Sequence, residues 1–315
     1  MKTTPSGPHA IVQPRSGSFF DRLVAQRYLV FLALPAVLVV FVFNYIPIYG
    51  IVISFQNFSV GRGVWGSPWV GLHWFERFFS NPLSGRLIRN TFLLGFLSLV
   101  ITFPLPIILA LSLNEIRSTA FKRSIQTISY LPYFISTVII VGMLKDFSSA
   151  GGLFNRLIIM LGGDRTLFFS RPEWFRPLFI GSEVWQTVGW GSIIYLAALA
   201  GVDPQLYESA VLDGAGRWRQ LWHITLPSIL PTVSILFILR SGAFFAVDFQ
   251  KVLLMYNPLT YETADIISTF VYREGIENAR FSYSAAVGLL LSVMAFVFLS
   301  ASNALSRRLS GNSLW

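Results

Sequence analysis

The residues that could do chemistry in this chain are few, and the most informative is an arginine inside an apolar segment. Arg240 lies in the run from Ser228 to Val247, which is otherwise uncharged. An arginine in a membrane-spanning segment costs about 2.5–3.5 kcal/mol on insertion scales, so its side chain must face a partner or water. Two interpretations follow. Arg240 forms an ion pair with Glu183 or Asp248, or its planar guanidinium binds the carboxylate of a solute.

The predicted depths of Arg240 and Glu183 allow the first interpretation. We predict one span from about residue 177 to 200 and another from about residue 228 to 247. At 1.5 Å per residue, Glu183 then lies roughly 9 Å and Arg240 roughly 10 Å from the same, outer ends of these spans. The two side chains could therefore meet at one level of the membrane.

Further polar side chains lie in the predicted spans and could bind the hydroxyl groups of a solute. They are Ser136, Thr137, Gln186, Ser192, Tyr195 and Ser241. Most such residues in membrane helices serve packing or interhelical hydrogen bonds, so both roles stay open for each. The predicted solute pathway consists of Arg240, Glu183, Gln186, Tyr195, Ser241 and Asp248.

Catalysis by this chain is not expected. The phosphate-binding pattern GxxxxGK[ST] does not occur, and the dipeptide Gly-Lys is absent. The chain has no cysteine, which excludes disulfides, thiolate nucleophiles and iron–sulfur ligation. Its three histidines, His9, His73 and His223, fall in separate segments, so no metal site is predicted. An intramembrane enzyme needs paired catalytic groups at one depth, and only the charged pathway residues could supply them. We predict no cofactor and no metal in this chain.

The composition predicts the elements that position these residues. Of 315 residues, 54% are hydrophobic and only 12% are charged, and the apolar residues form long blocks. Such a chain is an integral membrane protein, and the class that we predict is all-α. The net charge of +9 comes from lysines and arginines scattered among loops, which argues for lipid head groups or an anionic solute rather than nucleic acid.

About 20 apolar residues cross a bilayer as a helix, and this length divides the chain into six predicted spans. They cover about residues 28–55, 90–113, 125–144, 177–200, 228–247 and 283–305. Residues 1–27 are predicted to form a cytoplasmic tail with an interfacial helix, and residues 307–315 a second cytoplasmic tail. Residues 201–227 form the loop between the fourth and fifth spans.

This loop contains a broken helix. Residues 206–212 are good helix formers, and Asp213, Gly214 and Gly216 interrupt them. Residues 217–224 are amphipathic, so we predict a second helix that lies on the membrane surface. Pro227 is expected to open the fifth span.

The loop resembles the cytoplasmic loop of bacterial ABC-importer permeases, whose pattern is Glu-Ala-Ala, three residues, Gly, nine residues and Ile-x-Leu-Pro. Here Glu208-Ser209-Ala210 is followed by three residues, Gly214, nine residues and Ile224-Thr225-Leu226-Pro227. Only Ser209 departs from the pattern, one small residue replacing another. The resemblance implies a coupling helix that docks on an ATPase subunit. The implied coupling residues are Glu208, Ser209, Ala210, Asp213, Gly214, Ala215, Arg217 and Trp218.

Other segments extend the resemblance over almost the whole chain. They are NYIPIYGIVISFQNF (44–58), GSPWVGL (66–72), LNEIRSTAFKRSIQTISYLPYFIS (113–136), YNPLTYETADIISTFVY (256–272) and the terminal SLW (313–315). All look like the polysaccharide-type permeases of the carbohydrate-importer family, in particular the larger permease of alginate importers. This family implies the type I importer fold in the bacterial inner membrane. It also implies four partners: a second permease, two ATPase subunits that use ATP and magnesium, and an extracytoplasmic solute-binding protein.

The resemblance leaves the solute open. An acidic oligosaccharide is favoured by Arg240 and by arginines in the outer segments, which could attract anions. These are Arg156, Arg165, Arg171 and Arg176. A permease for a neutral oligosaccharide is the alternative within the same class. An autonomous secondary carrier is the alternative from another class, although no internal repeat or charged relay is evident.

Overall fold

The computed structural model describes residues 26–310, which are helical apart from connecting loops and one isolated bridge between Gln56 and Trp69. The all-α class predicted from the sequence is therefore confirmed for these residues. The chain divides into two units, Met1–Ile51 and Val52–Trp315. The predicted cytoplasmic tails fall largely on residues 1–25 and 311–315, which lie outside the described residues.

The first unit is built from one apolar segment. Its helix α2 (Arg27–Val40) continues into a π-helical turn, η1 (Phe41–Tyr45), and a 3-10 helix, η2 (Ile46–Phe55), within which the unit ends. The segment Arg27–Phe55 is long and apolar enough to cross a membrane, as the first predicted span requires.

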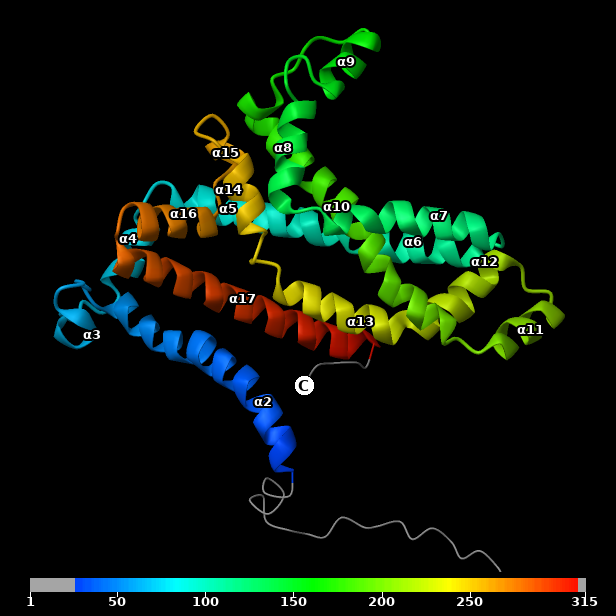
Figure 1. Cartoon of the computed structure of the whole chain (residues 1–315), viewed down its shortest axis with the longest axis horizontal. Coiled ribbons are helices and arrows are strands. Elements are labelled where there is room, and N and C mark those ends of the chain that lie inside the picture. Colours follow the sequence, from blue (N-terminus) through cyan, green and yellow to red (C-terminus); the bar gives the residue numbers. More distant parts are fainter. Residues whose placement is uncertain (1–25, 311–315) are drawn as a thin grey trace, which may run out of the picture. The chain divides into compact units, whose positions relative to one another are not determined.

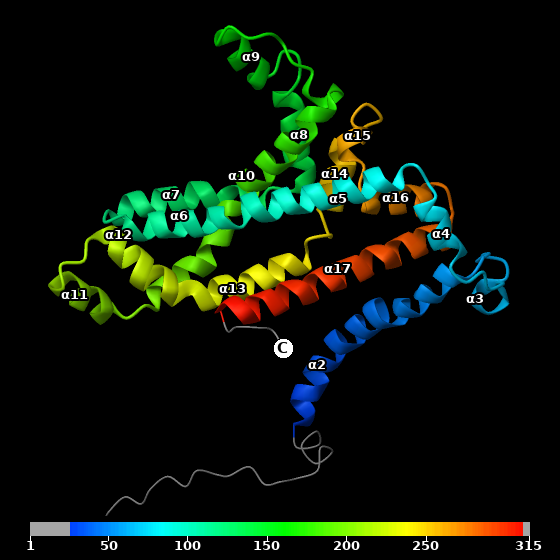
Figure 2. The ribbon, with the colours of Figure 1, turned by 180° about the vertical axis from the view of Figure 1, so that it is seen from behind.

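Long helices run through the second unit. One is α5 (Ser84–Leu97), continued by η3 (Ser98–Thr102) and α6 (Pro104–Glu115). Another is α17 (Phe281–Ser310), which lies along α13 (Leu226–Gly242) in both views (Figures 1 and 2). In the part of the chain that the structure describes, four helices could span a membrane by length and apolarity, or five if one bent pair counts as a span.

The helix α10 (Pro172–Ala200) is the exception in composition. Its 29 residues correspond to about 43 Å, more than the roughly 30 Å of a bilayer core. Charged and polar residues such as Glu173, Glu183 and Gln186 make it less apolar than the other long helices. The helix that is least typical of a span therefore carries the polar groups of the predicted pathway.

The predicted third span is not a straight helix. Residues 119–147 form α7 (Thr119–Tyr130), the 3-10 turn η4 (Leu131–Phe134) and α8 (Thr137–Phe147), with a bend of 101° before α8. Pro132 lies in the 3-10 turn, and the Ser136 hydroxyl caps α8 by accepting the Ile139 N–H at 3.4 Å. The predicted third span over residues 125–144 therefore contains a bend, because Ser136 starts a new helix.

The fifth span also differs from the prediction. Residues 217–242 form one continuous helix, made of α12 (Arg217–Gln220), the π-helical turn η6 (Leu221–Thr225) and α13. Residues 217–224, predicted as a separate surface helix, therefore form the first part of this continuous helix. Pro227 does not begin a separate helix, because the wide turn before it accommodates its ring.

The same device recurs at two other prolines. The π-helical turns η1, η3 and η6 end at residues 45, 102 and 225, and Pro47, Pro104 and Pro227 each follow two positions later. A proline ring clashes with the carbonyl of the preceding helical turn and offers no N–H. A π turn is wider by one residue, which relieves this conflict without breaking the helix.

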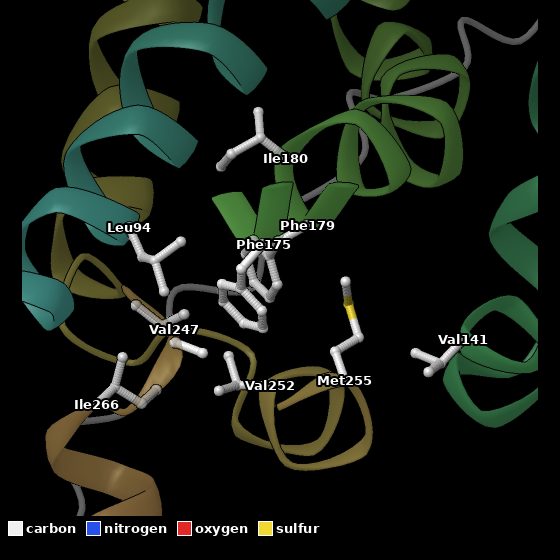
Figure 3. Packing of buried hydrophobic residues seen from close by; sticks show 10 residues of the cluster. Leu94, Val141, Phe175, Phe179, Ile180, Val247, Val252, Met255 and Ile266 are labelled. Atoms are coloured by element: carbon white, nitrogen blue, oxygen red, sulfur yellow. The ribbon is translucent and has the colours of Figure 1, made fainter. Parts of the chain in front are cut away.

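Short helices form the segments between the spans. They are α3 (Gly63–Gly66), α4 (His73–Phe79), α9 (Leu153–Met160), η5 (Phe168–Ser170), α14 (Phe249–Met255), α15 (Tyr261–Ala264), α16 (Ile267–Tyr272) and the π turn η7 (Arg273–Glu277). One buried apolar cluster joins α14 to α10. Figure 3 shows Phe175 and Phe179 of α10 pointing toward Val252 and Met255 of α14.

Candidate functional site

A polar cavity of about 200 Å³ lies between α5, η3, α10 and the segment that leads from α13 into α14. Its polar lining includes Ser98, Glu183, Gln186, Arg240, Asp248 and Lys251. The structure therefore brings four of the six predicted pathway residues to one cavity. Binding sites for drug-sized ligands usually have volumes of about 300–1,000 Å³, so the cavity in this form holds less than an oligosaccharide.

The centre of the cavity is an ion pair between Arg240 and Glu183. The Nη2 atom of Arg240 donates to Glu183 Oε1, to Ser98 Oγ at 3.0 Å and to Thr102 Oγ1 at 3.3 Å. The Ser98 hydroxyl in turn lies 2.8 Å from both carboxylate oxygens of Glu183. Three spans are thereby joined at one point, and the predicted Arg240–Glu183 pair is confirmed.

The helices that carry these two residues have other bounds than predicted. Because α13 ends at Gly242, Arg240 lies in its last turn rather than two turns inside it. Because α10 begins at Pro172, Glu183 lies about 17 Å from the start of its helix. The chain turns at residues 243–245 instead of continuing as a helix to Val247. The pair joins α13 to α10, which are in contact.

Asp248 caps a helix instead of forming the ion pair with Arg240 that was the predicted alternative. Its Oδ1 accepts the backbone N–H of Lys251 at 3.0 Å and caps the N-terminus of α14. It lines the cavity but makes no ion pair with Arg240. Gln186 also lines the cavity, and its Nε2 donates to the Ile135 carbonyl, at the bend before α8, at 3.3 Å.

Tyr195 and Ser241 do not line this cavity. Tyr195 is 3% exposed and packs in an apolar cluster with Ala110 and Ile229, next to a second, smaller cavity that also reaches Arg240. Ser241 is buried, and its hydroxyl has no hydrogen-bond partner among the described residues. The Ser192 hydroxyl donates to the Gly189 carbonyl at 2.6 Å, which is a packing role.

Lys251 is the cavity residue that sequence reasoning missed. Its side chain is 1% exposed, and its Nζ has no hydrogen-bond partner among the described residues. The ring of Phe179 lies 5.5 Å from Nζ and offers a cation–π contact of about 0.5–2 kcal/mol. Burying an ammonium group costs several kcal/mol, so this contact does not offset the burial.

Burial accordingly lowers the pKa of Lys251, while the charges of Glu183 and Asp248 act in the opposite direction. In the sequence, Lys251 follows Asp248 in a stretch that reads as a solvated outer loop. The sequence offers one signal for Lys251, namely its position three residues after Asp248, which can cap a helix. That spacing predicts the start of a helix, but it does not predict that the lysine side chain is buried.

The loop between the fourth and fifth spans forms a second candidate site. Helix α11 (Pro204–Leu212) is capped by Asp203, whose Oδ1 accepts the Gln205 N–H at 2.9 Å. It ends at Gly214, which has φ of +74°, in the left-handed region that favours glycine. The Ala215 N–H then donates to the Ala210 carbonyl at 2.8 Å. The predicted helix and glycine break are confirmed.

Most of the predicted coupling residues lie on the surface of this loop. Glu208, Ser209, Asp213, Arg217 and Trp218 are exposed, and Ala210 and Ala215 are half-buried. Trp218 is 76% exposed and Leu212 is 88% exposed. Large apolar side chains at this degree of exposure in a polar loop are compatible with an interaction surface.

Two contacts brace the loop against the helices beside it. Arg217 lies 3.8 Å from Glu115 at the end of α6, in an exposed pair that contributes about 0–1 kcal/mol. Tyr207 of α11 and Thr225 of η6 share a hydrogen bond of 3.0 Å between their hydroxyls. Neither contact was predicted from the sequence.

The arginines that were predicted to attract anions each have a separate environment. Arg156 donates to the Gly151 carbonyl, and Arg171 lies 4.0 Å from Glu173. Arg176 is half-buried and donates to Asn90 Oδ1 at 2.9 Å. Arg165 is exposed. Their predicted role in attracting an acidic solute stays a prediction.

Comparisons with known proteins complete the description. Residues 102–311 match the family model described as "Binding-protein-dependent transport system inner membrane component". Protein LplB of Bacillus subtilis is 41% identical over 318 residues, which cover all of both chains. The polygalacturonan/rhamnogalacturonan transport system permease protein YteP of the same organism is 43% identical over 93% of this chain and 92% of its own.

A solved structure is similar as well. The structure of a bacterial ABC transporter involved in the import of the acidic polysaccharide alginate contains a chain that is 40% identical, with a TM-score of 0.86. The match covers 92% of this chain and 99% of that chain. The same type of transporter was solved in complex with a periplasmic protein bound to an alginate pentasaccharide, with 38% identity, a TM-score of 0.87 and coverage of 94% and 99%.

Proposed function

The chain belongs to the family of inner membrane components of binding-protein-dependent transport systems, and on this premise we propose that it is the permease of an ATP-driven importer for acidic oligosaccharides or polysaccharides. Its spans would pass the saccharide from an extracytoplasmic binding protein to the cytoplasm by alternating access. It would hydrolyse no ATP itself. Two partner ATPase subunits would use ATP and magnesium, and a second, similar permease would complete the pathway.

One observation carries the transport mechanism. The loop from α11 to α12 exposes Glu208, Leu212 and Trp218, and the chain turns between the two helices at Gly214. An exposed apolar patch of this kind needs a partner. The proposed partner is an ATPase subunit on the cytoplasmic side, and both termini would then lie in the cytoplasm as well.

The acidic nature of the saccharide is supported by two lines. The cavity between α5, α10 and α13 contains the basic side chains of Arg240 and Lys251. The structurally similar transporter imports alginate, an acidic polysaccharide, and the relative YteP is named for polygalacturonan, a polymer of an acidic sugar.

Reconstitution tests the proposal. The chain should co-purify with an ATPase subunit and a second permease when the three are co-expressed. In liposomes, this complex should hydrolyse ATP faster when a saccharide-loaded binding protein is added, and uronate oligosaccharides should accumulate only with ATP. Uptake by the chain alone would instead identify a secondary carrier. ATP-dependent uptake restricted to neutral saccharides would overturn the acidic specificity and leave the permease assignment intact.

A further inference from the structure

The cavity beside the ion pair contains one buried basic group, Lys251, that makes neither a hydrogen bond nor an ion pair with any described residue. Arg240 is held by Glu183, Ser98 and Thr102 through a single nitrogen atom, so its charge has a carboxylate partner. The Asp248 carboxylate accepts the N-terminal N–H of α14. Lys251 has neither a carboxylate nor a hydroxyl within hydrogen-bond distance of Nζ among the described residues.

The burial of Lys251 makes this unusual. A lysine at the surface needs no partner because water solvates it, but Lys251 is 1% exposed. Its Nζ lies over the ring of Phe179 on α10, and the residue lines the cavity. A buried lysine without a partner is normally replaced by an apolar residue unless the charge has a use.

We infer that Lys251 is the residue that recognises the carboxylate of an acidic sugar unit in this cavity, and that it sets the preference for acidic over neutral saccharides. The carboxylate would accept a hydrogen bond from Nζ and so place a negative charge in direct contact with it, which no described residue does. Arg240 would then serve mainly to join α5, α10 and α13. The inference rests on the proposed function for the class of solute.

Matched saccharides separate this role from a structural one. We would compare uptake of a uronate trisaccharide with uptake of the same trisaccharide after reduction of its carboxylates to hydroxymethyl groups. The assay uses the complete importer, with both permeases, the ATPases and an unchanged binding protein, in liposomes. Because the binding protein is the same throughout, a change in the ratio of the two rates reports the permease.

Lys251→Met keeps the length of the side chain and removes its charge. We expect uptake of the uronate to fall about tenfold or more, because a hydrogen bond to a charged group is lost, while uptake of the reduced trisaccharide changes less than about twofold. Lys251→Arg should restore part of the uronate uptake. Equal losses for both saccharides, or no loss for either, would overturn the inference.

A second measurement remains decisive if Lys251→Met does not assemble. The chain has no cysteine, and Ala246 lines the cavity with its side chain exposed, so Ala246→Cys introduces a single reporter thiol. With Lys251 present, a negatively charged methanethiosulfonate should react faster than a neutral one of the same size. The uronate trisaccharide should slow both reactions, and the reduced trisaccharide should not. Equal rates for the two reagents, or equal protection by the two saccharides, would contradict the inference.

The outcomes distinguish this inference from the proposed function. A complex that transports the uronate normally with Lys251→Met retains its function, and only the role of Lys251 fails. A complex that transports no saccharide with the unaltered chain refutes the function before the variant is tested.

Discussion

Among single residues, Arg240 connects its own helix, α13, to two others, the α5–η3 helix and α10. Its Nη2 atom is shared by Glu183, Ser98 and Thr102, and the Glu183 side chain is only 14% exposed. Removing one partner of a buried ion pair costs about 3–5 kcal/mol. Because Arg240 is 42% exposed, solvent reduces this cost, and about 1–3 kcal/mol is the expected range.

We therefore predict that Arg240→Ala lowers the melting temperature of the detergent-purified chain and reduces uptake of acidic and neutral saccharides alike. Thermal unfolding and the paired uptake assay would measure the two effects. The double variant with Glu183→Gln is the control, and it should recover part of the lost stability because no unpaired carboxylate remains. A selective loss of acidic uptake at an unchanged melting temperature would instead make Arg240 the ligand of the solute.

The two basic residues of the cavity also show what the sequence can and cannot report. Arg240 and Glu183 interrupt apolar runs, where each charge demands a partner, and their pairing could be predicted from that fact alone. Lys251 follows Asp248 in a segment that contains other charged residues, so nothing in its neighbourhood signals burial. Its burial depends on Phe179, which lies 72 positions earlier in the chain.

At the scale of elements, the contact between α7 and α10 depends on a glycine. A Cβ atom at Gly189 would lie 1.9 Å from the Ser129 carbonyl oxygen, so the backbones touch there. At Gly181 on the same helix a Cβ would meet nothing within 4 Å. We predict that Gly189→Ala destabilises the chain by about 1–3 kcal/mol or prevents its folding.

Gly181→Ala is the matched control. In a helix interior, replacing glycine by alanine is favourable by up to about 1 kcal/mol when the site is open, so this variant should be neutral or slightly more stable. Thermal unfolding of both variants in detergent would measure the difference. A Gly189→Ala variant as stable as Gly181→Ala would show that α7 and α10 are not in close contact.

The coupling loop offers a similar pair of glycines. Gly214 has φ of +74°, whereas Gly216 has φ of −69°, and a Cβ would meet nothing within 4 Å at either position. Gly214→Val should distort the turn after α11, because a β-branched residue is strained in the left-handed region. We predict that ATP hydrolysis by the complex continues while uptake falls.

Gly216→Ala should leave the ratio of saccharide uptake to ATP hydrolysis unchanged, because its backbone conformation suits any residue. Both rates would be measured on the same liposomes. A normal ratio in the Gly214→Val complex would argue against a coupling role for this turn.

Local signals explain which elements were predictable. The capped helix α11 and its glycine break depend on neighbouring residues, and the sequence predicted both. The bend before α8 depends on Pro132 and Ser136 in an apolar run whose length suits a straight span. The helices α12 and α13 are continuous because a π turn makes room for Pro227. No pattern of residue types in the sequence predicts that turn.

For the molecule as a whole, the proposed function requires one orientation in the membrane, with the coupling loop on the cytoplasmic side. The absence of cysteine makes it measurable, because a single introduced thiol is unique. Ser209 is exposed in the coupling loop, and Leu161, between α9 and η5, is 86% exposed. We predict that an impermeant maleimide labels Leu161→Cys in intact cells and labels Ser209→Cys only in inverted vesicles.

Added ATPase subunits should slow the labelling of Ser209→Cys and leave Leu161→Cys unaffected, since only the first thiol lies in the proposed docking surface. Labelling of Ser209→Cys from outside the cell would reverse the topology and remove the basis of the proposed function.

The π turns that precede Pro47, Pro104 and Pro227 limit the kinds of motion open to the spans. Each π turn contains one residue more than a regular α-helical turn. If the position of the π turn shifted along the helix, the residues that it passed would rotate by about 100° about the helix axis. The proline two positions later favours one position for the π turn, because its ring would clash with the carbonyl of a regular turn there. In these three helices, opening and closing of a passage is therefore expected to come from movement of whole helical segments and not from a π turn that shifts along the helix.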